Sequence, residues 1–206
     1  LQISNFHHRK GGAWEPIKLG LYREIKKQRD NKLYFDLFML GSLLIMAFYN
    51  IGLFILRRKD RSPLYLGIVC LLAGLRSVLV GERFLIQQFP QFSWEVFQKL
   101  EYMTFFLSIT FFILFISALF QDFSKFVARF MAWVGVLFCL FTLATPARIF
   151  SYELPVYHAI FFAVSLYSFY AFGKVLINRR EGGVWIVLGV MVLLITVLMD
   201  GFAVMY

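Results

Sequence analysis

The sequence predicts an all-α membrane protein, a helical transmembrane bundle preceded by a short β-hairpin. Two observations carry this prediction. Hydrophobic residues make up 60% of the chain and mean hydropathy is +0.72, well above the roughly 45–50% apolar content of soluble domains. In addition, the apolar residues are gathered into six long runs. Because a spanning helix needs about 20 apolar residues, 206 residues have room for about six crossings and one small polar segment.

The polar segment is the first 32 residues. Residues 1–6 and 15–19 alternate in polarity and flank a glycine pair, which indicates two short strands joined by a turn. A lone pair of strands is marginally stable in water. We therefore expect the C-terminal hairpin of an extracellular domain whose earlier part precedes Leu1, followed by a charged connector over residues 21–32.

The transmembrane domain is predicted over residues 33–206. Each of its apolar runs is long enough to span a bilayer, and charged or turn-forming residues separate them. The predicted spans are 33–56, 63–81, 102–120, 126–145, 155–178 and 184–206.

Basic residues between the spans predict the orientation. Nine of them fall in loops on one side and three on the other, so the first side is expected to face the cytoplasm. The N-terminal segment then lies outside despite eight basic residues of its own, because a large exported domain is translocated largely regardless of its charge. Six crossings would end outside, and a seventh helix beyond Tyr206 would return the chain to the cytoplasm.

Charge and motifs argue against several classes of function. The net charge of +9 would suggest nucleic acid in a soluble protein, but here the basic residues flank hydrophobic runs, so no nucleic-acid partner is expected. Cys70 and Cys139 lie in apolar runs without ligand-spaced partners. The chain also lacks a phosphate loop, a His-Glu zinc motif and a nucleophile elbow. We expect no catalytic, cofactor or metal site, and no enzyme.

Several segments, in this order and spacing, resemble the bacterial seven-transmembrane receptors with diverse intracellular signalling modules, the 7TMR-DISM family. The residues that carry the resemblance are Tyr49–Phe54, Arg57–Tyr65, Leu75–Ser77, Gly81–Arg83 and Trp94–Tyr102. The opening residues Asn5–Gly12 are similar to the end of that family's jelly-roll-like extracellular sensor domain.

The resemblance implies a multi-pass receptor of the bacterial cytoplasmic membrane, with its N-terminus outside. It implies a small extracellular ligand, for instance a carbohydrate, and seven helices in the lipid bilayer. It also implies a kinase or cyclase type of signalling domain on the cytoplasmic side of the same full-length chain. A homodimer is compatible with such a receptor.

Five charged residues form a candidate polar cluster: Arg76, Glu82, Arg83, Glu101 and Asp200. The two arginines are seven residues apart near the outer end of the second span. Glu101 lies at the start of the third span, close enough to form an ion pair with one of them. Asp200 would lie in the outer half of the sixth span. Charges at that depth are costly unless paired or hydrated. They form either a functional cluster or structural pairs and interfacial residues.

Other features have structural interpretations. His158 stands without a partner at ligand spacing, which is typical of a structural histidine. Small residues are expected to allow close helix contacts, namely Gly41, Ser42, Gly67, Ala73, Gly74 and Gly135.

Two functions remain open from the sequence. The first is a receptor in which external ligand binding shifts a helix-bundle equilibrium. The alternative is a multi-pass transporter or an integral membrane enzyme that uses the same charges. No inverted repeat or paired helix break of the kind found in transporters is visible.

Overall fold

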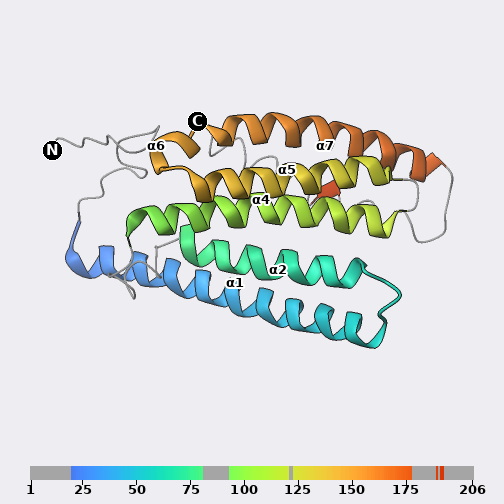
Figure 1. The fold of residues 1–206 in the computed structure, drawn as a ribbon. Helices are drawn as coiled ribbons and strands as arrows, with labels where there is room; N and C mark the ends of the chain where they lie inside the picture. The colour runs from blue at the N-terminus through green and yellow to red at the C-terminus, as the bar shows by residue number, and fades with distance from the viewer. Residues whose placement is uncertain (1–19, 81–92, 121–122, 178–188, 190, 193–206) are drawn as a thin grey trace.

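The computed structural model describes residues 20–80, 93–120, 123–177, 189 and 191–192. These residues form long helices, which Figure 1 shows running side by side along a common direction. The helices whose two ends are described are α1 Tyr22–Leu56, α2 Ser62–Val80, α4 Trp94–Leu119, α5 Lys125–Ala144, α6 Ala147–Phe150 and α7 Glu153–Ile177. No strand occurs in this part of the chain, and the predicted hairpin over residues 1–19 lies outside it.

Five helical segments are long and apolar enough to cross a membrane, counted over the described residues. They correspond to the first five predicted spans, the fifth comprising α6 together with most of α7. The predicted sixth span, 184–206, falls almost wholly outside the described ranges. The helical membrane bundle is therefore confirmed for its first five members.

Two helices begin earlier than the apolar runs predict. α1 starts at Tyr22, so the predicted connector over residues 21–32 is helical and continuous with the first span. This segment lacks Gly and Pro between Tyr22 and Lys32, and its lysines, arginines and glutamate are good helix formers. α4 starts at Trp94 rather than at residue 102, with Glu95 in the first turn and a 3.3 Å ion pair from Lys99 to Glu95.

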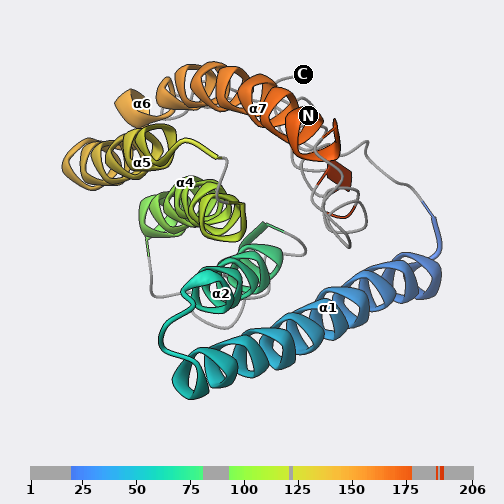
Figure 2. The same cartoon turned by 90° about the vertical axis from the view of Figure 1, so that its right-hand side faces the viewer.

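Helices that follow one another in the sequence also pack against one another. Viewed along the bundle, Figure 2 shows α1, α2, α4, α5 and α7 arranged in a curved row. α1 packs on α2, α2 on α4, and α4 on α5, while α7 contacts α5. The core is centred on α4, whose Phe106, Ile113 and Ile116 are fully buried.

Glycines mark the closest helix approaches. A Cβ at Gly67 would lie 3.0 Å from Ile51 and 3.2 Å from the Ala47 carbonyl oxygen of α1. A Cβ at Gly135 of α5 would overlap the Thr110 side chain of α4. The expectation of close packing is thus confirmed for these two and for Gly74, whereas Gly41 faces open space.

Large apolar side chains cover the outside of the bundle. On α5, Phe126, Trp133 and Leu137 are each at least 60% exposed. A continuous apolar surface of this kind is unfavourable in water and is the ordinary surface of a helix bundle in lipid.

Candidate functional site, a polar layer at one end of the bundle

Arg76 joins α2 to α4. Its guanidinium Nη1 donates a 3.2 Å hydrogen bond to the backbone carbonyl oxygen of Glu101. The guanidinium carbon also lies 4.9 Å from the centre of the Phe105 ring, within range of a cation–π interaction. The charged end of Arg76 is thereby held over one aromatic side chain and beside one helix carbonyl.

The predicted proximity of Arg76 and Glu101 is therefore found, but the bond runs to the main chain of Glu101. Glu101 lies two turns inside α4 and is half-buried. Its carbonyl oxygen also accepts a 2.9 Å bond from Thr104 Oγ1. The other members of the predicted cluster, Glu82, Arg83 and Asp200, lie outside the described residues.

His158 of α7 also packs on Phe105. The two rings are stacked, with centroids 5.0 Å apart and planes 27° from parallel. The His158 Nδ1 lies 2.7 Å from the Leu154 carbonyl oxygen. Because a carbonyl only accepts, Nδ1 carries the proton of this bond. Nε2 is buried and has no hydrogen-bond partner within the described part of the chain.

Tyr157 secures α7 to α4 beside this stack. It is fully buried, and its hydroxyl donates a 2.8 Å bond to the Phe106 carbonyl oxygen. The hydroxyl also lies 3.3 Å from Thr110 Oγ1. The Tyr157 ring packs against the rings of Phe106 and Phe138, with centroids 4.5 and 5.2 Å away.

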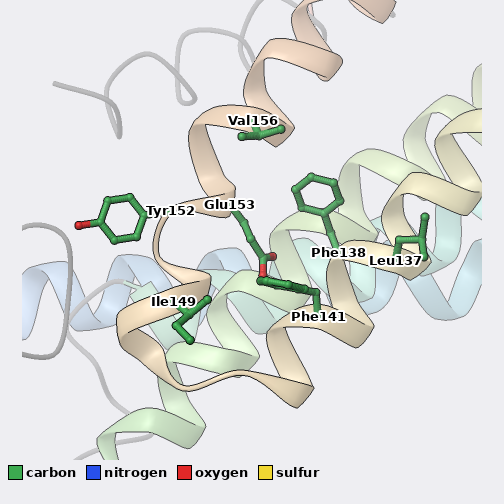
Figure 3. A pocket seen from close by; sticks show the side chains of 7 residues that line it. All are labelled: Leu137, Phe138, Phe141, Ile149, Tyr152, Glu153 and Val156. Atoms are coloured by element: carbon green, nitrogen blue, oxygen red, sulfur yellow. The ribbon is translucent and has the colours of Figure 1, made fainter.

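A third polar contact joins α7 to α5. Thr142 Oγ1 donates a 3.1 Å bond to Glu153 Oε2 at the start of α7. Both residues are buried. Figure 3 shows the Glu153 side chain directed from the start of α7 toward the Phe141 side chain of α5, with Phe138 beside it.

These contacts form one polar layer, defined here as Arg76, Glu101, Phe105, Tyr157 and His158. It links α2, α4 and α7 near the ends where α2 finishes and α7 begins. Chemically it is a network of a cation, aromatic faces and helix carbonyls that connects three helices. No group of three His, Cys, Asp or Glu that would hold a metal ion occurs among the described residues.

Sequence reasoning missed part of this site. From the sequence alone His158 has only a structural interpretation, and Glu153, Tyr157 and Thr142 belong to no recognised motif. A usable signal was present for two of them, because Glu153 and Tyr157 are four residues apart and so lie on one face at the start of one helix.

The fold defines a multi-pass helical membrane protein in which polar contacts of Arg76, Tyr157 and Glu153 join neighbouring helices. The family model described as 7TM diverse intracellular signalling matches residues 32–206. The chain therefore belongs to this family, and it is the membrane region of a transmembrane signalling receptor. No curated protein and no solved structure matches the chain.

Proposed function

We propose that this chain relays ligand binding at an extracellular domain to a cytoplasmic signalling output through a shift between two arrangements of its helices. The ligand is a small molecule, such as a carbohydrate. The output is of kinase or cyclase type, on the same full-length chain, in a bacterial cytoplasmic membrane. The observation that carries the proposal is the polar layer, together with membership of the signalling family.

The polar layer has the properties of a two-state contact. Arg76 contacts α4 through a hydrogen bond to Glu101 and a ring contact with Phe105, and the Phe105 ring stacks on His158 of α7. Helix shifts of about 1–2 Å are typical of signalling transitions, and they exceed the tolerance of a 3.2 Å hydrogen bond. Arg76 is half-buried, so loss of this hydrogen bond weakens the hold of its charge on α4 and disfavours intermediate positions.

α1 supplies a rigid connection toward the extracellular side. Its 35 residues extend about 52 Å, whereas the hydrocarbon core is about 30 Å thick. The eleven residues from Tyr22 to Lys32 add about 16 Å of helix before the first predicted span. In the proposed orientation this extension projects outward, so a movement transmitted to Tyr22 acts on the bundle through continuous helix.

Replacing Arg76 by alanine in the full-length receptor tests the proposal. Coupling between sites is typically worth 5- to 150-fold. We expect the basal output, measured as nucleotide-dependent product formation in membrane vesicles, to change by at least about fivefold. Arg129→Ala is the matched control, because Arg129 is exposed and its described bond is to Lys125 of its own helix. An R76A receptor with normal expression and unchanged output would refute the relay through Arg76.

Cysteine accessibility tests the orientation. In a background without Cys70 and Cys139, Ser93→Cys and Asp60→Cys place single thiols at opposite ends of the bundle. With the N-terminus outside, a membrane-impermeant maleimide should label Ser93→Cys in intact spheroplasts and Asp60→Cys only after permeabilisation. The reverse pattern would place the polar layer on the cytoplasmic side and overturn the proposed direction of signalling.

A further inference from the structure

A pocket opens beside the polar layer, where α5, α6 and the start of α7 meet. Its volume is about 480 Å³, within the range of about 300–1,000 Å³ typical of small-molecule sites. Figure 3 shows the side chains that line it: Leu137, Phe138, Phe141, Ile149, Tyr152, Glu153 and Val156. All but one of them are apolar or aromatic, and the exception is the carboxylate of Glu153.

Among the described residues, the Glu153 carboxylate accepts only one hydrogen bond, and that bond is shared. Glu153 is 8% exposed, and its Oε1 atom is buried without a hydrogen-bond partner among the described residues. Its Oε2 atom faces Thr142 Oγ1 at 3.1 Å, but that hydroxyl also lies 2.8 Å from the Phe138 carbonyl oxygen. One hydroxyl proton cannot fully satisfy both acceptors. A buried carboxylate in this position is costly until a donor reaches it.

The lining specifies the charge of a suitable ligand. Three aromatic side chains, Phe138, Phe141 and Tyr152, line the same pocket as the carboxylate. Ring faces and a carboxylate together favour an ammonium group. Among the described residues, no basic side chain lines the pocket, so a ligand phosphate or carboxylate would meet Glu153 without compensation.

The outer wall of the pocket belongs to the lipid-facing surface. Leu137, Phe141 and Val156 are 60%, 47% and 54% exposed. An apolar chain lying in the bilayer can therefore contact the lining while its head group reaches Glu153. We propose that this pocket binds a lipophilic amine, a single-chain amphiphile with a cationic ammonium head and no anionic group. This inference goes beyond the relay of an extracellular ligand and does not depend on it.

Photo-crosslinking tests the pocket directly. The full-length protein is reconstituted in phosphatidylcholine nanodiscs and labelled with a dodecylamine analogue that carries a diazirine at the end of its chain. We expect saturable labelling of peptides spanning residues 137–156. Excess dodecylamine should abolish this labelling, whereas dodecanol and dodecanoic acid should leave it unchanged. Equal competition by dodecanol would overturn the proposal, because it would show that the chain binds without its charge.

Variants separate the carboxylate from the cavity. Glu153→Gln keeps the side-chain shape and should reduce labelling at least tenfold, whereas Glu95→Gln, an acid on α4 paired with Lys99, should not. Leu137→Trp fills the pocket and leaves Glu153 intact, so it gives the same test should Glu153→Gln fail to fold. Undiminished labelling in both pocket variants would overturn the proposal. Loss of wild-type labelling in nanodiscs that contain phosphatidylethanolamine would also overturn it, in favour of a phospholipid.

Discussion

Replacing Tyr157 by phenylalanine removes one hydroxyl from the contact between α4 and α7 and leaves the ring in place. Its 2.8 Å bond to the Phe106 carbonyl oxygen has good geometry, while the 3.3 Å approach to Thr110 is long for two hydroxyls. Interhelical hydrogen bonds in membrane proteins are worth about 0.6 kcal/mol on average and about 1.7 at most. We therefore expect Tyr157→Phe to cost about 1 kcal/mol.

Tyr157→Ala removes the ring as well. The ring is fully buried and packs within 4.5 Å, centroid to centroid, of Phe106. Truncating a buried aromatic residue to alanine costs about 3–5 kcal/mol, because a cavity remains. The phenylalanine variant should therefore lose about a quarter of what the alanine variant loses.

Unfolding in mixed micelles titrated with sodium dodecyl sulfate, followed by helicity, measures both losses. Tyr170→Phe is the control, since Tyr170 lies on the same helix with 72% of its surface exposed, and it should change stability by less than about 0.5 kcal/mol. Equal losses for Tyr157→Phe and Tyr157→Ala would refute the reasoning that the ring dominates. If neither Tyr157→Phe nor Tyr157→Ala lowered stability, the packing of α7 on α4 through Tyr157 would be refuted.

Two further predictions concern packing and pH. Gly135→Ala should lower stability by about 1–3 kcal/mol, because the added Cβ overlaps Thr110. Gly41→Ala should be neutral or raise stability by up to about 1 kcal/mol, because nothing lies close to Gly41. The same titration measures both variants, and equal effects would contradict the close helix approach at Gly135. At the start of α2, the backbone N–H and hydroxyl of Ser62 donate to Asp60 and lower the pKa of that carboxyl from 3.8. The resulting stabilisation is fully present above pH 3.8 and is lost as pH falls through the lowered pKa. The free energy of unfolding of the wild type should exceed that of Asp60→Asn by a few tenths of a kcal/mol at neutral pH, and this difference should disappear in acid. A difference that grows in acid would contradict the lowered pKa of Asp60.

The transmembrane helices were predictable because a bilayer imposes a simple length rule on apolar runs. Their true starts were less visible. Residues 22–32 and 94–101 are charged or amphiphilic, so hydropathy alone predicts that each helix starts only where its apolar run starts. Local propensity and ion pairing extend α1 and α4 past that point.

The candidate site was predictable where it involves helices that are neighbours in sequence. Arg76 and Glu101 flank one connection between antiparallel spans, so their proximity follows from topology. The use of the Glu101 carbonyl rather than its side chain depends on rotamer and helix rotation, which one sequence does not specify. The stack of Phe105 on His158 joins residues 53 positions apart, and it requires the rotation of α7 about its own axis.

Gly67 and Gly74 leave two notches on the surface of α2 that faces α1, and these notches constrain how α1 can move. Ile51 approaches the backbone at Gly67, and Leu40 approaches it at Gly74 two turns further along α2. A slide of α1 along its axis would withdraw both side chains from their notches together, and the next matching position lies about one helical turn, 5.4 Å, away. The register between α1 and α2 therefore favours tilting about Gly67 and Gly74 or a full one-turn step over continuous sliding, which gives α1 discrete positions.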